Sequence, residues 1–182
     1  MGSSFVVESL LLLLGPDVGD DGGDFVLGEA DVEVKTTRSE RRIHVIHGLG
    51  QLTPTPGRPL HLMSVQVTGA GAAGNGETLP ELIERIRRRL RSGRTDFDDR
   101  LTDCGWEDAQ ADRLYTTRLL VRSEPRFYTV DEAFPAITSA GLSRIVTRPE
   151  LVRSIDYRID VTDLEPEGTA PTEFAAAPTH ED

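Results

Sequence analysis

The sequence predicts an α/β protein, in which strands of a β-sheet are accompanied by helices. Stretches rich in valine and isoleucine at residues 24–37, 43–48 and 60–68 have the composition of strands. Residues 78–91 follow them, and their apolar positions recur with the spacing of an amphipathic helix. The chain thus combines predicted strands with a predicted helix, and the class expected for it is α/β.

Length and composition suggest a single domain in a cytoplasmic protein. The 182 residues are enough for a single domain with its own core, expected at residues 1–163. Residues 164–182 are acidic and rich in Pro, Ala and Thr, so we expect a disordered tail there. The net charge of −11 argues against nucleic-acid binding by overall charge, and a local basic patch or a partner subunit would be needed. The single cysteine, Cys104, excludes an internal disulfide, and we expect a cytoplasmic protein.

The first predicted element is a short apolar helix at residues 4–14. Its leucine run is too short for a membrane span and lacks the basic residues that precede a signal peptide core. Glu8 is the only charged residue of this helix. Because the helix starts almost at Met1, we expect that an upstream segment is missing.

The next element is a β-hairpin with its tip near residues 29–30. In its second arm valines alternate with charged residues, so Glu33 and Lys35 share one face of the strand. A connection of two or four residues centred on the tip would pair Asp24 with Lys35 and Val26 with Glu33. Asp24 would then join the face of Glu33 and Lys35, whereas a three-residue connection would turn it to the other face.

The remaining elements follow from apolar periodicity and turn residues. Residues 38–42 are predicted to be an exposed turn, and residues 60–68 a strand that is buried on both faces. A capping box formed by Thr78 and Glu81 starts the amphipathic helix. The buried stripe of that helix is predicted to contain Leu82, Ile83, Ile86 and Leu90. Further predicted elements are a helix at 96–106, a hairpin at 114–130 and final strands that end near residue 163.

Lys35 is the only lysine among the 20 lysines and arginines of the chain. A lysine kept at one position indicates a need for a compact ammonium, which the rigid guanidinium does not replace. Two carboxylates on adjacent strands can hold Mg²⁺ beside a phosphate, and a lysine on their face can orient water or stabilise developing charge. Asp24, Glu33 and Lys35 therefore predict a metal-dependent site that cleaves phosphodiesters.

The spacing of the acid and the lysine is weak support when taken alone. Because 31 of the 182 residues are Asp or Glu, chance puts an acid two positions before the only lysine about one time in six. A strand with alternating charges is also commonly a solvated face or one side of a cross-strand ion pair.

A resemblance over a longer stretch, residues 8–163, adds to this pattern. The sequence resembles bacterial PD-(D/E)XK motif proteins of the restriction-endonuclease-like nuclease superfamily. One departure is Gly23, which stands where the motif has a proline. The resemblance implies a restriction-endonuclease-like mixed β-sheet flanked by helices. It is carried, in this order, by GPDVGDDGGDFVLGEADVEVKTT, RIHVIHGLGQL, RPLHLMSVQV, GETLPELIERIRRRL, AFPAIT and IDYRIDV.

The resemblance also implies roles for individual residues. In that superfamily an Asp precedes a hairpin whose second strand carries Glu-x-Lys, and the acids bind magnesium; these places fall on Asp24, Glu33 and Lys35. A Gln that follows the lysine strand in many members points to Gln51 as a further catalytic residue. An acid on the preceding helix points to Glu8 as a third metal ligand. The implied cofactor is Mg²⁺ or Mn²⁺.

The function implied by the resemblance is a metal-dependent DNA endonuclease that hydrolyses phosphodiester bonds in restriction or phage defence. Six arginines between residues 85 and 94 form the basic cluster that could contact DNA, although a solvated helix face explains them equally well. Arg85, Arg88 and Arg89 are the predicted contacts.

Two other functions stay open. A catalytically inactive subunit could keep the nuclease fold and act as a binding or assembly component of a defence system, and the acidic charge favours it. An acidic mimic of nucleic acid that binds a basic protein is the third hypothesis. His44 and His47 are expected on opposite faces of one strand, so we do not expect them to share a metal ion.

Overall fold

The computed structural model describes residues 25–27, 30–71, 75–90 and 93–167. The predicted helix with Glu8, Asp24 and the predicted tail beyond residue 167 lie outside these residues. Contacts divide the described chain into two compact units. We call residues 25–65 and 125–167 the sheet unit, and residues 66–124 the helical unit. Strand β4 (Leu60–Gly69) begins in the sheet unit and ends in the helical unit.

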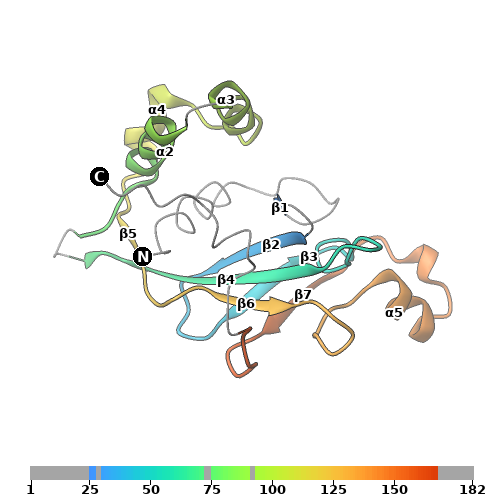
Figure 1. Ribbon diagram of the computed structural model, residues 1–182. Coiled ribbons are helices and arrows are strands. Elements are labelled where there is room, and N and C mark those ends of the chain that lie inside the picture. The colour runs from blue at the N-terminus through green and yellow to red at the C-terminus, as the bar shows by residue number, and fades with distance from the viewer. Residues whose placement is uncertain (1–24, 28–29, 72–74, 91–92, 168–182) are drawn as a thin grey trace. The chain divides into compact units, whose positions relative to one another are not determined.

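The sheet unit contains the hairpin on which the sequence interpretation depends. Its strand order is β1-β2-β4, with β6 also paired to β4, while β3 pairs with β7 (Figure 1). The pairs β1–β2, β4–β6 and β3–β7 are antiparallel. Besides β4, the strands are β1 (Phe25–Leu27), β2 (Ala30–Thr37), β3 (Ile43–His47), β6 (Arg126–Thr129) and β7 (Asp156–Asp160).

Strands β2 and β4 run parallel to each other. The backbone N–H of Asp31 donates to the carbonyl of Pro59 at 2.9 Å, which joins the starts of the two strands. Both strands continue forward from that point, so they can lie side by side only in the same direction. The sheet is therefore mixed. Together with the α-helices that the chain forms after β4, it confirms the predicted α/β class.

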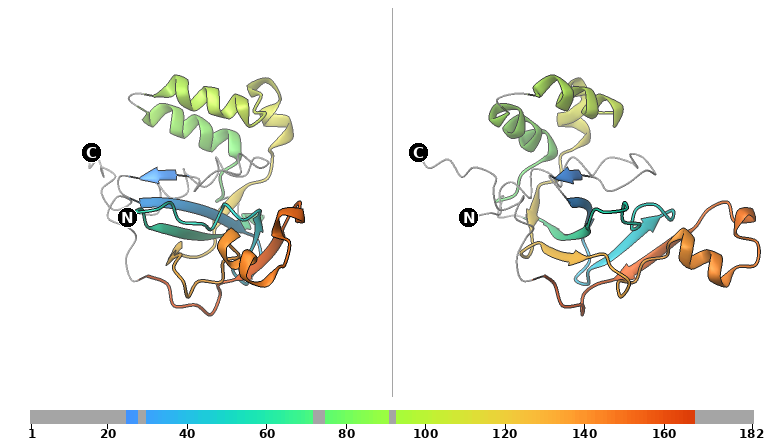
Figure 2. Two further views of the ribbon diagram at one scale, coloured as in Figure 1. Left: turned by 90° about the vertical axis from the view of Figure 1, so that its right-hand side faces the viewer. Right: turned by 45° about the vertical axis from the view of Figure 1, so that its right-hand side comes forward.

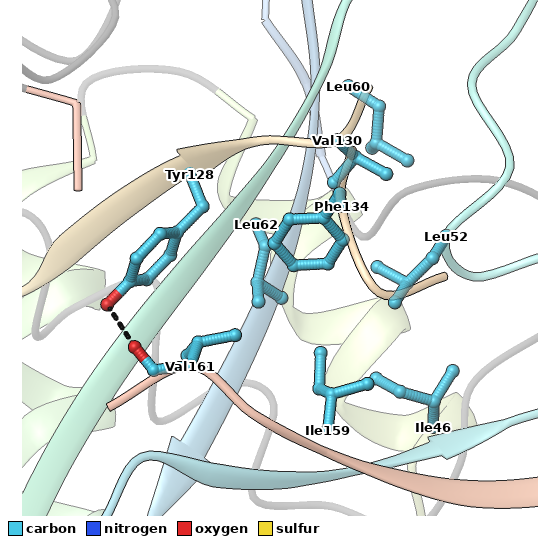
Figure 3. Packing of buried hydrophobic residues seen from close by; sticks show 9 residues of the cluster. All are labelled: Ile46, Leu52, Leu60, Leu62, Tyr128, Val130, Phe134, Ile159 and Val161. Atoms are coloured by element: carbon cyan, nitrogen blue, oxygen red, sulfur yellow. Dashed lines mark hydrogen bonds between the residues drawn. The ribbon is translucent and has the colours of Figure 1, made fainter. Parts of the chain in front are cut away.

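The core of the sheet unit is a cluster of nine buried side chains (Figure 3). Leu62 of β4 is fully buried within it, and the hydroxyl of Tyr128 donates to the carbonyl of Val161 at 3.0 Å. Residues 62–67 of β4 are buried at every position, which confirms the prediction of a strand that is buried on both faces. The cluster consists of Ile46, Leu52, Leu60, Leu62, Tyr128, Val130, Phe134, Ile159 and Val161.

The helical unit begins with the predicted capping box. Helix α2 (Leu79–Arg89) has Thr78 as its N-cap; the Thr78 hydroxyl accepts from the N–H of Glu81, whose carboxylate accepts from the N–H of Thr78. Leu90 was predicted on the buried stripe and is instead 36% exposed, because the helix ends before it and Leu90 is the C-cap. The other predicted stripe residues are buried, namely Leu82, Ile83 and Ile86. None of the described helices is long and apolar enough to cross a membrane.

The predicted second hairpin is wrong. Strand β5 (Leu119–Val121) and strand β6 both pair antiparallel with β4 and not with each other. β4 has 10 residues, so it is long enough to pair with β6 at residues 61–64 and with β5 at residues 67–69. The helices between β4 and β5 are α2, α3 (Arg94–Asp103) and α4 (Asp108–Leu114).

We predict that Leu62→Ala lowers the free energy of unfolding by about 2–5 kcal/mol, because it leaves a cavity in the nine-residue cluster. Urea denaturation measures this loss. Ile145→Ala is the matched control, since Ile145 is 80% exposed, and should change the free energy by no more than about 0.5 kcal/mol. Equal effects of the two substitutions would contradict this description of the core.

Candidate functional site

Glu33 and Lys35 are brought together on strand β2. The Lys35 Nζ lies 2.6 Å from Oε1 of Glu33. Residues two positions apart on a strand point to the same face, which explains why the two side chains meet. The contact places an ammonium directly beside a carboxylate, as the sequence interpretation expected for these two residues.

The Glu33 carboxylate is buried, whereas Lys35 reaches solvent. The side chain of Glu33 is 1% exposed and that of Lys35 is 17% exposed. The expectation that this face of the strand could be solvated is therefore wrong for Glu33. A buried carboxylate is costly unless a cation and hydrogen bonds compensate it, and Lys35 supplies the cation. The partly exposed ammonium lies where a ligand arriving from solvent could meet it.

The register of the hairpin differs from the predicted one. Val26 pairs with Asp31, where the sequence interpretation paired it with Glu33. The shift is two residues along β2 and arises because Leu27 pairs with Ala30, so the connection is the two residues 28–29. A shift of two preserves the side-chain face of each residue. The observed register therefore leaves the predicted faces of the hairpin positions unchanged. Asp24 itself lies outside the described residues.

Asp31 is a second buried acid on this face that the sequence interpretation assigned only to the hairpin arm. Its carboxylate accepts from Nε of Arg58 at 2.9 Å, and its side chain is 8% exposed. Arg58 also donates to the carbonyl of Ala30 at 3.2 Å. Asp31 is therefore neutralised from the loop before β4, whereas Glu33 is neutralised by Lys35 on its own strand.

A buried polar cluster of Arg42, His44 and Ser64 was also missed. Residues 38–42 were predicted to form an exposed turn, yet Arg42 is 2% exposed. Its Nη1 donates to the carbonyl of Ser64 at 2.7 Å and to the Ser64 hydroxyl at 3.1 Å. The same hydroxyl lies 2.7 Å from Nε2 of His44. Ser64, which is 22 residues away in the sequence, thus provides hydrogen-bond acceptors for the buried guanidinium. No local sequence pattern around Arg42 indicates these contacts.

The electrostatics of this cluster extend to Lys35. The pKa of His44 is lowered from its ordinary 6.5 to about 4, mainly by burial and also by the positive charges of Arg42 and Lys35. A backbone hydrogen bond with Thr36 of β2 acts in the opposite direction. His44 is thus an uncharged ring at neutral pH, and it links β3 to Ser64 of β4.

Gln51 lies in the turn that follows β3. Its Oε1 accepts from the backbone N–H of His47 at 3.0 Å. The Nδ1 of His47 in turn lies 2.7 Å from Oδ1 of Asp156 on β7. The hydrogen bond of Gln51 therefore stabilises the end of β3, and it goes to His47 rather than to Glu33 or Lys35.

The arginines of helix α2 are largely engaged with acids of their own unit. Nε and Nη2 of Arg85 lie 2.8 Å and 2.5 Å from the two carboxylate oxygens of Glu77. The buried Arg87 donates to Asp108, Asp98 and Glu84, and the hydrogen bond to Asp108 contributes most to raising its pKa above the usual value.

The other two predicted DNA contacts, Arg88 and Arg89, are exposed. Arg88 lines a hollow of the helical unit in which acids outnumber it. The remaining lining residues are Asn75, Gly76, Glu77, Pro80, Glu81, Glu84 and Asp112. Helix α2 thus presents less free positive charge than its sequence indicates.

Comparison with models of protein families identifies the family of this chain. The family model DUF4420, described as "Putative PD-(D/E)XK family member", matches residues 15–162. The chain belongs to this family. No curated protein and no solved structure gives a significant match. Membership in DUF4420 confirms the resemblance to PD-(D/E)XK proteins, and the mixed sheet with its helices is consistent with the restriction-endonuclease-like fold.

The predicted metal site of this DUF4420 chain lies only in part within the described residues. Within the residues that the structure describes, no three side chains of His, Cys, Asp or Glu gather closely enough to hold a metal ion. Glu33 is described, but the other two predicted ligands, Asp24 and Glu8, are outside this part. The whole ligand set, Glu33 included, therefore stays a prediction.

We predict that His44 makes the protein less stable in mild acid. The unfolded chain protonates His44 near pH 6.5 and the folded chain only near pH 4, so between these values acidification favours the unfolded state. The free energy of unfolding should be about 1 kcal/mol lower at pH 5.5 than at pH 7.5 because of this group.

Urea denaturation at both pH values measures this difference, and His44→Gln is the control. Glutamine keeps a polar group near Ser64 but does not titrate, so the pH-dependent loss should shrink by about 1 kcal/mol in this variant. An unchanged pH dependence would show that His44 is not the group responsible.

Proposed function

We propose that this protein is a divalent-metal-dependent DNA endonuclease that hydrolyses phosphodiester bonds, in restriction or phage defence. The observation that carries the proposal is the contact of a buried carboxylate, Glu33, with the only lysine of the chain, Lys35. The contact lies on β2 within the region that matches a PD-(D/E)XK family.

Glu33 has the chemistry that a metal ligand needs. Carboxylate oxygens are preferred ligands of Mg²⁺ and Mn²⁺, and Glu33 is held in one place by burial and by Lys35. Asp24, and less directly Glu8, are the proposed further ligands. When bound, such an ion polarises phosphoryl oxygens and lowers the pKa of a water molecule.

Lys35 is proposed to contribute in two ways. Its ammonium lies 2.6 Å from the Glu33 carboxylate and so offsets the cost of burying that group. Because the lysine side chain is partly exposed, the same ammonium can donate a hydrogen bond to a phosphate oxygen of bound DNA or to the attacking water. Arginine would carry the charge but not the compact shape.

Gln51 is retained as a weaker catalytic candidate. Its Oε1 is engaged by the N–H of His47, so its direct contribution is the geometry of the turn after β3. Arg85, Arg88 and Arg89 remain proposed DNA contacts, but the pairing of Arg85 with Glu77 weakens that part of the proposal.

The proposal predicts that the purified protein nicks or cuts plasmid DNA in Mg²⁺ or Mn²⁺ and not in EDTA. Glu33→Gln and Lys35→Met should each reduce the initial rate about 10²–10³-fold, because each removes a group that stabilises the transition state. Gel electrophoresis of supercoiled plasmid measures the rate, and thermal unfolding checks that each variant is folded.

Two further variants sharpen this experiment. Glu132→Gln removes an exposed acid from a loop and should leave the rate unchanged. Lys35→Arg keeps the charge and should still lose most of the activity. If Glu33→Gln and Lys35→Met cut as fast as the wild type, the activity comes from a contaminant and the proposal fails.

A catalytically inactive subunit is the second candidate. It is favoured by the net charge of −11 and by the acids that engage arginines of α2. Calorimetric titration with Mg²⁺ separates the two candidates. Heat of binding that disappears in Glu33→Gln supports the nuclease, whereas its absence from the wild type supports the inactive subunit.

A further inference from the structure

One segment of the sheet unit is largely exposed. It comprises residues 137–154 and contains α5 (Ser139–Ile145) and the 3₁₀ helix η2 (Pro149–Leu151). We call it the α5 arm. In the right-hand view of Figure 2, α5 lies beyond the ends of β3 and β7 of the same unit. Leu142 is the only residue of the arm that is buried.

The first residues of the arm are nevertheless held in place by hydrogen bonds. The N–H of Ile137 donates to the hydroxyl of Tyr157, on β7, at 3.0 Å. Thr138 is the N-cap of α5, and its hydroxyl accepts from the N–H of Gly141 at 3.1 Å. Tyr157 itself packs against the core cluster of the sheet unit. The arm is therefore a projecting element with a fixed attachment.

Large apolar side chains of the arm lie in solvent. Leu142 and Ile145 are one helical turn apart and thus share a side of α5, yet Leu142 is 9% exposed and Ile145 is 80% exposed. Leu151 and Val152 follow at 57% and 38%. Single exposed apolar residues are ordinary, but several within one short projecting segment are typical of a contact surface.

The charge of the arm is opposite to that of the whole chain. It contains three arginines and one glutamate, which gives a net charge of +2 in a chain of net charge −11. Arg148 pairs with Glu150 at 3.0 Å. Arg144 and Arg153 are exposed and have no ion pair or hydrogen bond with the described residues. Two guanidinium groups are thus left for a partner.

The arm differs in this respect from the other basic segment, helix α2. There Arg85 is bound by Glu77, and Arg87 is bound by three acids. Positive charge that is already compensated adds little to the binding of a polyanion. The positive charge of α2 is therefore used within the protein to a greater degree than that of the arm.

We propose that the α5 arm is the surface through which this protein holds duplex DNA, with Arg144 and Arg153 contacting phosphates. The choice of partner rests on the proposed function, because a DNA-cleaving protein of net charge −11 needs a local site where a polyanion is attracted. Ile145 and Leu151 then lie against the sugar faces or between base steps, as apolar side chains do in the minor groove. The arm and Glu33 belong to the same compact unit.

The test measures binding apart from cleavage. Fluorescence anisotropy of a short labelled duplex in EDTA and low salt reports affinity without any metal-dependent cutting. We expect Arg144→Glu/Arg153→Glu to weaken binding about tenfold or more. The plot of log affinity against log salt should also become less steep by about two, one for each lost phosphate contact.

Arg100→Glu/Arg113→Glu is the matched control, since it changes the net charge equally at two exposed arginines of the helical unit. Its affinity should stay within about twofold of the wild type if overall charge is a minor influence. An equal loss in the control and the arm variant would overturn the proposal. So would Arg88→Glu/Arg89→Glu losing affinity while the arm variant binds normally, because helix α2 would then be the DNA surface.

A protein partner for the arm is tested in parallel. If wild-type protein elutes as a dimer, Ile145→Ser/Leu151→Ser elutes as a monomer, and the arginine variant binds DNA normally, the arm joins two copies of the chain and the proposal is wrong. Failure of the nuclease proposal is separate, because the anisotropy experiment does not use Glu33, Lys35 or metal. Loss of binding in the arm variant supports the DNA surface even if no cleavage is found.

Discussion

The contact between Glu33 and Lys35 is the interaction on which the functional account depends. It joins a carboxylate that is almost fully buried to an ammonium that reaches solvent, at 2.6 Å. Burial of a carboxylate is tolerated because the cation is adjacent, and the same arrangement presents a positive group at the protein surface. A strand with alternating residues produces it at no cost in backbone geometry, because side chains two positions apart share a face.

The surroundings of this pair consist of other compensated charges. Arg58 neutralises Asp31 at the start of β2, and Arg42 donates to the carbonyl of Ser64 on β4. His44 is kept uncharged by burial and lies next to the same serine. Where two buried polar groups are paired in this unit, removing one leaves the other without compensation. Within the Glu33–Lys35 pair, the ammonium of Lys35 is the group that reaches solvent.

The sequence predicted those features that depend on local periodicity. Alternation along DVEVK was sufficient to place Glu33 and Lys35 on one face, and the Thr78–Glu81 box marked the start of α2. It did not predict the burial of Arg42, because that depends on Ser64, which is distant in sequence. The hairpin register was shifted by two residues, since the connection lies at residues 28–29 rather than 29–30 and composition does not determine where a short connection is centred. β5 and β6 were mistaken for a hairpin because their shared partner, β4, lies far upstream.

The most direct test of the account is a crystal structure of the protein soaked in Mn²⁺, with anomalous diffraction used to locate the ion. The account predicts anomalous density at the carboxylate of Glu33, with Asp24 among the ligands and the ammonium of Lys35 beside the site. Glu33 that still contacts only protein groups in saturating Mn²⁺, or an ion bound at other residues, would contradict the account.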